Sequence, residues 1–157
     1  MKDEPILIRN PGSIRPWQHV LEPLYGYLLL GSLLIEKGKD YSGAWNFGPS
    51  LNQRITVLAL VQEIILQWGE GEYEFGPQQD NGLEANLLQL DISKALNKLN
   101  WYPVLDFGRA VELSIDEYKI DRGAHEHNLQ QRLEHINLYM DLRSSSSRRQ
   151  DETMQSM

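Results

Sequence analysis

Apolar side chains recur along this chain with helical spacing in some stretches and with strand-like spacing in others. The most regular stretch is 57–68, where the apolar residues are Val57, Leu60, Val61, Ile64, Ile65 and Trp68. Their spacing of i, i+3, i+4, i+7, i+8 and i+11 places them on one face of an α-helix. Thr56 can cap the start of this helix and Gly69 can end it. We therefore predict an amphipathic helix over 57–68.

Four further helices are predicted, over residues 22–37, 92–99, 107–120 and 122–141. The first has Pro23 in its first turn, where the missing N–H costs nothing, and Gly38 after its end. Asp91 and Asp106 can cap the next two. The apolar run at 24–35 is shorter than the roughly 20 residues that span a bilayer. We therefore expect a buried helix here and no membrane partner.

Short apolar runs between turn residues predict strands at 5–9, 44–47, 73–75 and 87–90. Strands that alternate with helices favour an α/β fold built from packed layers. The predicted strand at 44–47 has no evident partner within the chain. This indicates that neighbouring structure is missing.

The character of the chain changes after residue 121, where it becomes polar. A helical stripe of apolar residues still continues through Leu129, Leu133, Ile136 and Met140. Residues 142–157 include four consecutive serines and few large apolar side chains, so they cannot bury enough surface to order themselves. We therefore divide the chain into a lobe at 1–121, a polar C-terminal helix at 122–141 and a disordered tail at 142–157.

The charge balance and the composition exclude several classes of function. The chain has 157 residues, a net charge of −7 and a pI near 5.1. This argues against a general nucleic-acid-binding protein, because phosphate binding requires cations. Cysteine is absent, so disulfides and thiolate metal sites are excluded, and we expect a cytoplasmic protein. The spacing of His125, His127 and His135 fits no zinc motif, and no metal is expected.

Residues 9–24 read RNPGSIRPWQHVLEPL and form the most distinctive segment of the chain. This segment closely resembles the signature of CDP-glucose 4,6-dehydratases, which are extended short-chain dehydrogenase/reductase proteins of the NAD-dependent epimerase/dehydratase family. Further matches follow in the expected order at 43–49 (GAWNFGP), 90–95 (LDISKA) and 99–103 (LNWYP). The resemblance covers most of the chain up to residue 118.

The resemblance implies the C-terminal, substrate-binding lobe of an extended Rossmann-type dehydratase, with short strands and about five helices. Such enzymes are lyases of nucleotide-sugar metabolism. They use bound NAD to oxidise C4 of the hexose, eliminate water across C5 and C6, and return the hydride to C6. The product, CDP-4-keto-6-deoxyglucose, is a precursor of sugars in bacterial surface polysaccharides.

The sequence lacks the two features that perform this chemistry in the family. One is a glycine-rich turn that lets backbone approach the pyrophosphate of NAD, and no G-x-x-G-x-x-G occurs here. The other is a Tyr-x-x-x-Lys pair; Tyr118 comes nearest, but Arg122 stands four residues on. We therefore expect a fragment without the N-terminal dinucleotide-binding half. It would carry no catalytic residue, bind no NAD by itself and be inactive alone.

The resemblance also implies six substrate-binding residues, namely Arg15, Asn46, His19, Gln18, Arg9 and Glu84. Arg15 is the strongest candidate, because an arginine at this place in the family contacts the nucleotide diphosphate. Its planar guanidinium suits bidentate binding of phosphate oxygens. A surface ion pair is the alternative for Arg15, and a salt bridge from a strand end is the alternative for Arg9.

The other four candidates have equally plain structural alternatives. His19, Gln18 and Asn46 could each be a core residue that satisfies neighbouring backbone groups. Glu84 matches part of a His-Glu-Ala element, but Leu83 stands where the family has histidine. That departure removes a hydrogen-bonding group and weakens the expected affinity for ligand.

We therefore predict a fragment of a CDP-glucose 4,6-dehydratase that binds CDP-glucose or a related nucleotide sugar. Apolar faces left open by the missing half favour association with an N-terminal partner chain or self-association. Two alternatives stay open. One is a non-catalytic interaction or ligand-binding module, and the other is a fragment of a related nucleotide-sugar dehydratase or epimerase that recognises another base.

Overall fold

The computed structural model describes residues 4–77, 86–119 and 125–155. Its elements follow in the order β1 (Ile6–Ile8), α1 (Leu21–Lys37), a 3-10 helix (Gly38–Tyr41), α2 (Val57–Trp68), β2 (Tyr73–Phe75), α3 (Ser93–Leu99), α4 (Phe107–Lys119) and α5 (His125–Gln155). The predicted α/β fold with about five helices is confirmed. Within these described ranges, no helix combines the length and the apolar character needed to cross a membrane.

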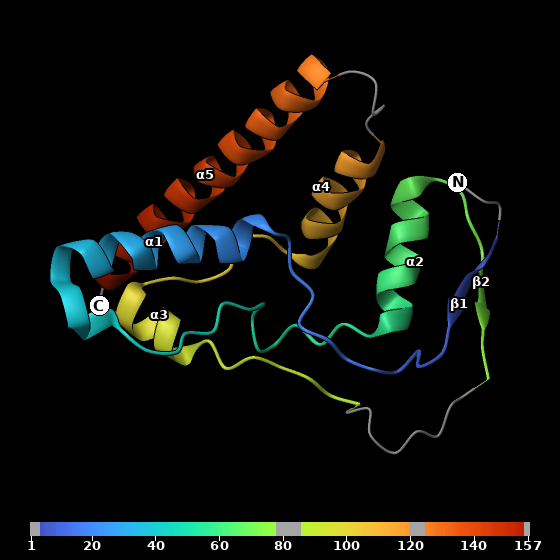
Figure 1. The fold of residues 1–157 in the computed structure, drawn as a ribbon, viewed down its shortest axis with the longest axis horizontal. Helices are drawn as coiled ribbons and strands as arrows, with labels where there is room; N and C mark the ends of the chain where they lie inside the picture. The colour runs from blue at the N-terminus through green and yellow to red at the C-terminus, as the bar shows by residue number, and fades with distance from the viewer. Residues whose placement is uncertain (1–3, 78–85, 120–124, 156–157) are drawn as a thin grey trace.

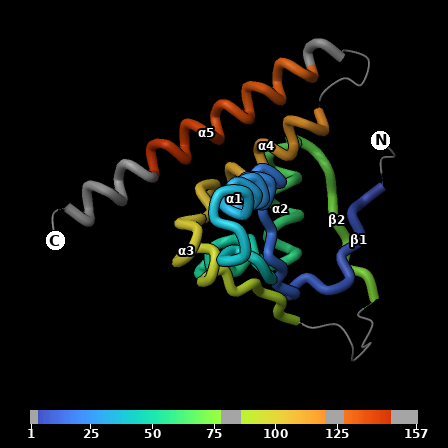
Figure 2. Tube along the Cα trace, turned by 60° about the vertical axis from the view of Figure 1, so that its left-hand side comes forward, coloured from blue at the N-terminus to red at the C-terminus, as the bar shows by residue number. Residues whose placement is uncertain are grey.

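The elements gather at two ends of an elongated molecule. Figure 1 shows α1 and α3 at one end, the two strands at the other, and α2 and α4 between them, with α5 leaning over α1 and α4. Figure 2, seen from a direction turned by 60°, shows α5 as an outer layer across the other helices. The segment that joins β1 to α1 therefore runs from the strand end of the molecule to its middle, where α1 begins.

The sheet consists of β1 and β2, which run parallel with Ile6 opposite Tyr73 and Ile8 opposite Phe75. The bounds of β2 agree with the predicted strand at 73–75. Helix α2 precedes β2 in the chain and packs against both β1 and α4. The sheet is thus a small two-stranded layer at the edge of the helices, and α2 packs against it.

Helix α2 has the bounds, the cap and the end that the sequence predicts. Thr56 Oγ1 accepts a hydrogen bond from the backbone N–H of Ala59 at 3.1 Å. Gly69 ends the helix in the left-handed region with φ of 97°, and its N–H donates to Ile65 O. Both contacts are local, so they follow directly from residue types and spacing.

Two predicted strands are wrong. Residues 44–47 join no strand among the residues that the structure describes. Instead, the carbonyls of Ala44 and Phe47 accept hydrogen bonds from the side chains of Lys94 and Gln18, both at 2.9 Å. Residues 87–90 form only one isolated parallel bridge, from Leu87 to Ile14. Both runs have the composition of strands, but a strand also requires a partner for its backbone.

The core divides into two clusters. The first, which we call the α1–α3 cluster, consists of Phe47, Ile92, Ala95, Leu99 and Trp101, with α1 packed against it. The second, the α4–α5 cluster, consists of Leu105, Ala110, Leu113 and Tyr139. Together they hold α1 between α3 and α5.

Helix α5 continues to Gln155, past the predicted end at 141 and into the segment expected to be a disordered tail. Leu142 packs on the α4–α5 cluster, and the guanidinium of Arg143 donates to Tyr102 O at 2.6 Å and lies over the ring of Tyr25. These contacts join α5 to residues far away in the sequence, which composition alone cannot show. The division at 121 and 141 into lobe, helix and tail stays a prediction.

Candidate functional site

The distinctive segment at 9–24 is held in place by its backbone. Ile14 exchanges hydrogen bonds with the 86–88 segment, receiving one from Leu88 N at 3.1 Å and donating one to Asn86 O at 2.9 Å. On the other side, Val57 N donates to Ser13 O at 2.9 Å. Residues 13 and 14 are therefore fixed between the start of α2 and the 86–88 segment. The side chains that follow project from a rigid base.

Arg15 lies directly after this base and lines a narrow crevice. The other lining residues come from three short segments and are Pro16, Pro49, Ser50, Leu51, Gln53, Gln89 and Leu90. The Nη1 of Arg15 donates to the carbonyl of Ile14 at 2.9 Å. The crevice measures about 10 Å³. Its chemistry, a cation among backbone and amide groups, is compatible with an anion.

Gln18 connects the distinctive segment to the extended residues 44–48, and Asn46 connects those residues to Asp91. Gln18 Nε2 donates to Phe47 O at 2.9 Å, and Asn46 Nδ2 donates to Asp91 O at 3.2 Å. The Oε1 of Gln18 is buried without a hydrogen-bond partner among the described residues. Both amides therefore satisfy backbone carbonyls in this structure. Asn46 itself is exposed.

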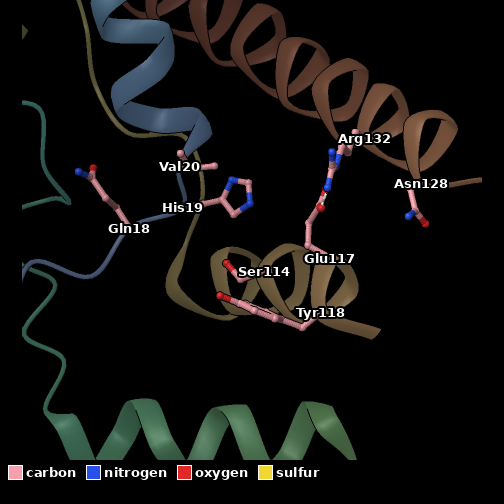
Figure 3. Close-up of a pocket in the computed structure, with 8 residues that line it drawn as sticks. All are labelled: Gln18, His19, Val20, Ser114, Glu117, Tyr118, Asn128 and Arg132. Atoms are coloured by element: carbon pink, nitrogen blue, oxygen red, sulfur yellow. Dashed lines mark hydrogen bonds and ion pairs between the residues drawn. The ribbon is translucent and has the colours of Figure 1, made fainter. Parts of the chain in front are cut away.

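His19 points to a different side of the segment from Arg15. Its Nδ1 accepts a hydrogen bond from Leu21 N at 3.3 Å, and its ring is buried. Burial lowers the pKa of His19, nearby His135 lowers it further, and Glu117 opposes the shift. The neutral ring lines a polar pocket of about 550 Å³ between the start of α1, α4 and α5. Figure 3 shows this pocket, with His19 facing Glu117 and Arg132.

The remaining two predicted residues stand apart. Arg9 is exposed just after β1. Glu84 lies outside the described residues. The structure thus brings Arg15 and Gln18 against the 47–53 segment and places Asn46 just before it. Gln18 also lines the polar pocket that His19 faces. The role of all six residues in substrate binding stays a prediction.

Glu22, the fourteenth residue of the 9–24 segment, has a structural role that the sequence did not reveal. Its Oε1 accepts hydrogen bonds from Val104 N and Leu105 N, each at 2.8 Å, and its Oε2 accepts from the Tyr139 hydroxyl at 2.9 Å. Burial raises the pKa of Glu22, against the effect of these hydrogen bonds and of Arg143. The one feature of the sequence that could have indicated this role is a charged residue on an otherwise apolar face of the predicted helix.

One curated relative matches the sequence. No protein-family profile matches the chain. However, over 101 residues, 64% of this chain, it is 42% identical to the CDP-glucose 4,6-dehydratase of Salmonella typhimurium. The aligned region is homologous to part of that enzyme. The resemblance predicted from residues 9–24 is therefore confirmed, and the aligned region amounts to 28% of the Salmonella enzyme.

A solved structure supports the same fold. It is a UDP-glucose 4-epimerase from Stenotrophomonas maltophila with bound NAD and formylated UDP-arabinopyranose, and it matches with a TM-score of 0.57 at 20% identity. The match covers 68% of this chain and 32% of the epimerase. The chain thus spans about a third or less of the length of either relative. At this identity the likeness shows the fold alone, which matches that of about a third of the epimerase.

The NAD that the dehydratase family uses does not fit the described residues. A Rossmann site needs a glycine turn between a strand and the first turn of a helix, where the N–H groups meet the pyrophosphate. Here β1 leads through the 9–20 segment to α1, whose first turn holds the buried carboxyl of Glu22. The first turn of α2 is capped by Thr56. Neither of these helix starts therefore offers a Rossmann-type site for NAD.

Proposed function

We propose that this chain supplies the nucleotide-sugar side of a CDP-glucose 4,6-dehydratase and requires a second, NAD-binding half for turnover. The single observation that carries the proposal is the 42% identity over 101 residues to the Salmonella enzyme. The bound nucleotide sugar named for the Stenotrophomonas epimerase supports the same class of ligand. By itself the chain would show no dehydratase activity, because it offers no NAD site in its described residues.

Within this proposal, Arg15 binds the diphosphate of the nucleotide sugar. Its position supports this role, since residues 13 and 14 are fixed by backbone hydrogen bonds and Arg15 follows them at a crevice formed with the 49–53 and 89–90 segments. A guanidinium bound to phosphate oxygens forms short, charge-assisted hydrogen bonds. The crevice is too narrow for a diphosphate. Binding therefore requires the 49–53 segment to move or the second half to complete the site.

The proposal is tested by calorimetric titration of the chain with CDP and CDP-glucose, followed by UDP, GDP and dTDP in competition. We expect binding to cytidine nucleotides that falls at least ten-fold in Arg15→Gln, because a charge-assisted hydrogen bond contributes about 1.5–3 kcal/mol. Lys98→Gln, which removes an exposed cation on α3, is the matched control and should leave affinity unchanged.

The outcomes separate the proposal from its alternatives. Equal affinity in Arg15→Gln and Lys98→Gln would contradict the assignment of Arg15. Preference for another base would favour a related nucleotide-sugar dehydratase or epimerase. Dehydration of CDP-glucose by the chain alone with added NAD would overturn the need for a second half. Binding without turnover, even after a second half is supplied, would favour a non-catalytic ligand-binding module.

A further inference from the structure

Helix α5 presents apolar side chains on two separate faces. Its inner face packs on the α4–α5 cluster through Leu138, Tyr139 and Leu142. Its outer face carries four large apolar residues that are 43–61% exposed, which we call the α5 stripe: Leu129, Leu133, Ile136 and Met140. At 3.6 residues per turn, the stripe lies roughly 140° around the helix from the inner face. Because α5 forms the outer layer of the molecule (Figure 2), the described part of the chain leaves the stripe largely open.

The intervals between the residues of the α5 stripe are those of a helix-pairing seam. They are four, three and four residues, which is the alternation that a heptad repeat gives to its apolar core positions. A helix with such a seam pairs with a second helix, and the side chains of each fill the holes between those of the other. The stripe extends from residue 129 to residue 140, which is about 18 Å of helix. Its spacing therefore favours one helix of similar length as the partner.

The order of these intervals fits a second copy of the same helix. Four, three and four reads the same in both directions, so the stripe is complementary to itself when two helices run antiparallel. In that arrangement Leu133 lies opposite Ile136 of the other copy, and Leu129 lies opposite Met140. Every side chain of the stripe then meets an apolar side chain. Both copies use the same surface, so the contact closes after two chains.

The polar residues around the α5 stripe are compatible with self-pairing. The chain has a net charge of −7, so two copies repel each other unless the surfaces that meet are free of acidic groups. Next to the stripe on one side lie two neutral amides, Gln130 and Asn137. On the other side lies Arg132, whose charge is balanced by a carboxylate of α4 at 3.1 Å. The acidic residues of this stretch, Glu134 and Asp141, lie further around the helix.

We propose that the α5 stripe is a self-association surface, through which two copies of this chain form an antiparallel helix pair. Four side chains and their polar neighbours cover less than the roughly 800 Å² per partner of a standard interface, so the dimer is weak and depends on concentration. The pairing is independent of the proposed function, because neither Arg15 nor a second, NAD-binding half takes part in it.

The first test is sedimentation equilibrium of the full chain without nucleotide, over a range of concentrations up to about 1 mM, where even weak association is measurable. Leu133→Glu places a charge in the middle of the α5 stripe, at a side chain that is 46% exposed. Leu66→Glu makes the same change on α2, at a side chain that is 73% exposed, and is the matched control. We expect a dimer that dissociates at least ten-fold more readily in Leu133→Glu and is unchanged in Leu66→Glu.

The second test uses the absence of cysteine from the chain, and it keeps the proposal testable if Leu133→Glu unfolds α5. Single cysteines are introduced by Leu133→Cys and Ile136→Cys, and disulfide-linked dimers are counted after mild oxidation. Antiparallel pairing brings these two positions together, so an equal mixture should form at least ten-fold more disulfide-linked dimer than either variant alone. A chain that stays monomeric at every concentration, equal effects of Leu133→Glu and Leu66→Glu, or a mixture that links no better than the single variants would each overturn the proposal.

Discussion

Helix α1 is held by two regions of different character. Its middle rests on the apolar α1–α3 cluster, where Gly26 touches the ring of Phe47. Its first turn is held by the buried carboxyl of Glu22, which accepts hydrogen bonds from Val104, Leu105 and Tyr139. The stability that the apolar region contributes depends on buried area and close packing. The stability that the polar region contributes depends on the orientation of three hydrogen-bond donors.

The difference bears on how the two regions fail when they are altered. Apolar packing loses energy in proportion to the atoms removed, and neighbours can partly relax into the space. When a buried carboxyl is removed, the donors that it accepted from are left unsatisfied. When its donors are removed, the carboxyl itself is left unsatisfied. Each such group then has its full desolvation cost. We therefore expect the polar region to be the more sensitive of the two, although it contains fewer residues.

The largest effect is expected for Glu22→Ala. The change leaves the N–H groups of Val104 and Leu105 and the Tyr139 hydroxyl without their acceptor, so unfolding should become easier by about 3 kcal/mol or more. Urea denaturation followed by circular dichroism measures this. Glu36→Ala, on the exposed end of the same helix, should stay within about 0.5 kcal/mol of the parent chain. Similar losses for both variants would show that the polar region has no special weight.

The apolar region is tested by a pair of glycine substitutions in α1. Gly26→Ala forces a Cβ into the ring of Phe47, and we expect a loss of about 1–3 kcal/mol from overpacking. Gly31→Ala adds the same methyl group to open space and should gain about 0.5–1 kcal/mol, because alanine favours the helix. The difference between the two midpoints in urea isolates the contact. Stabilisation by both changes would mean that the α1–α3 cluster is loosely packed.

The same contrast explains how much of the fold could be predicted. Helix α2 and strand β2 have the predicted bounds, and α1 differs by one residue, because spacing, caps and glycine ends are local signals. Residues 44–47 have the composition of a strand, yet composition does not supply a partner. The continuation of α5 beyond 141 depends in part on Arg143 reaching Tyr102, which lies 41 residues away in the sequence.

In the candidate site, too, some features follow from the local sequence and others only from the fold. The resemblance at 9–24 selected Arg15, and the backbone that fixes it begins at Ser13 and Ile14 in the same segment. The surroundings of Arg15 come from the 49–53 and 89–90 segments, which only the fold brings together. Residue type alone could not show that Gln18 would contact Phe47 while His19 would face α4 and α5.

The dependence of stability on pH separates two buried titratable groups near the start of α1, His19 and Glu22. Chiefly because of burial, the pKa of His19 lies below 6.5 in the folded chain. As the pH falls, His19 is therefore protonated in the unfolded chain before it is protonated in the folded chain. Stability should therefore fall as the pH drops from 6.5 toward the folded pKa, by up to about 1.4 kcal/mol per pH unit. Glu22 acts in the opposite sense, because burial raises its pKa above 4.5 and stability falls as the pH rises through that folded pKa.

His19→Gln removes the first of these effects and leaves the second. Its urea midpoint should decline less than that of the parent chain between pH 6.5 and pH 5, and the two should differ least in slope above pH 7. Parallel profiles for the two proteins would show that the His19 ring titrates alike in the folded and unfolded chains.

The smallest effect is expected where only local contacts act, at the start of α2. Thr56→Ala removes the acceptor for Ala59 N and should lower stability by about 1 kcal/mol, whereas Thr56→Ser keeps the hydroxyl and should stay close to the parent. Because this cap involves neither the α1–α3 cluster nor Glu22, its effect should add to that of Gly26→Ala. Thermal unfolding of the double variant measures this. A combined loss well above or well below the sum would mean that the α2 cap and the Gly26 contact are energetically coupled.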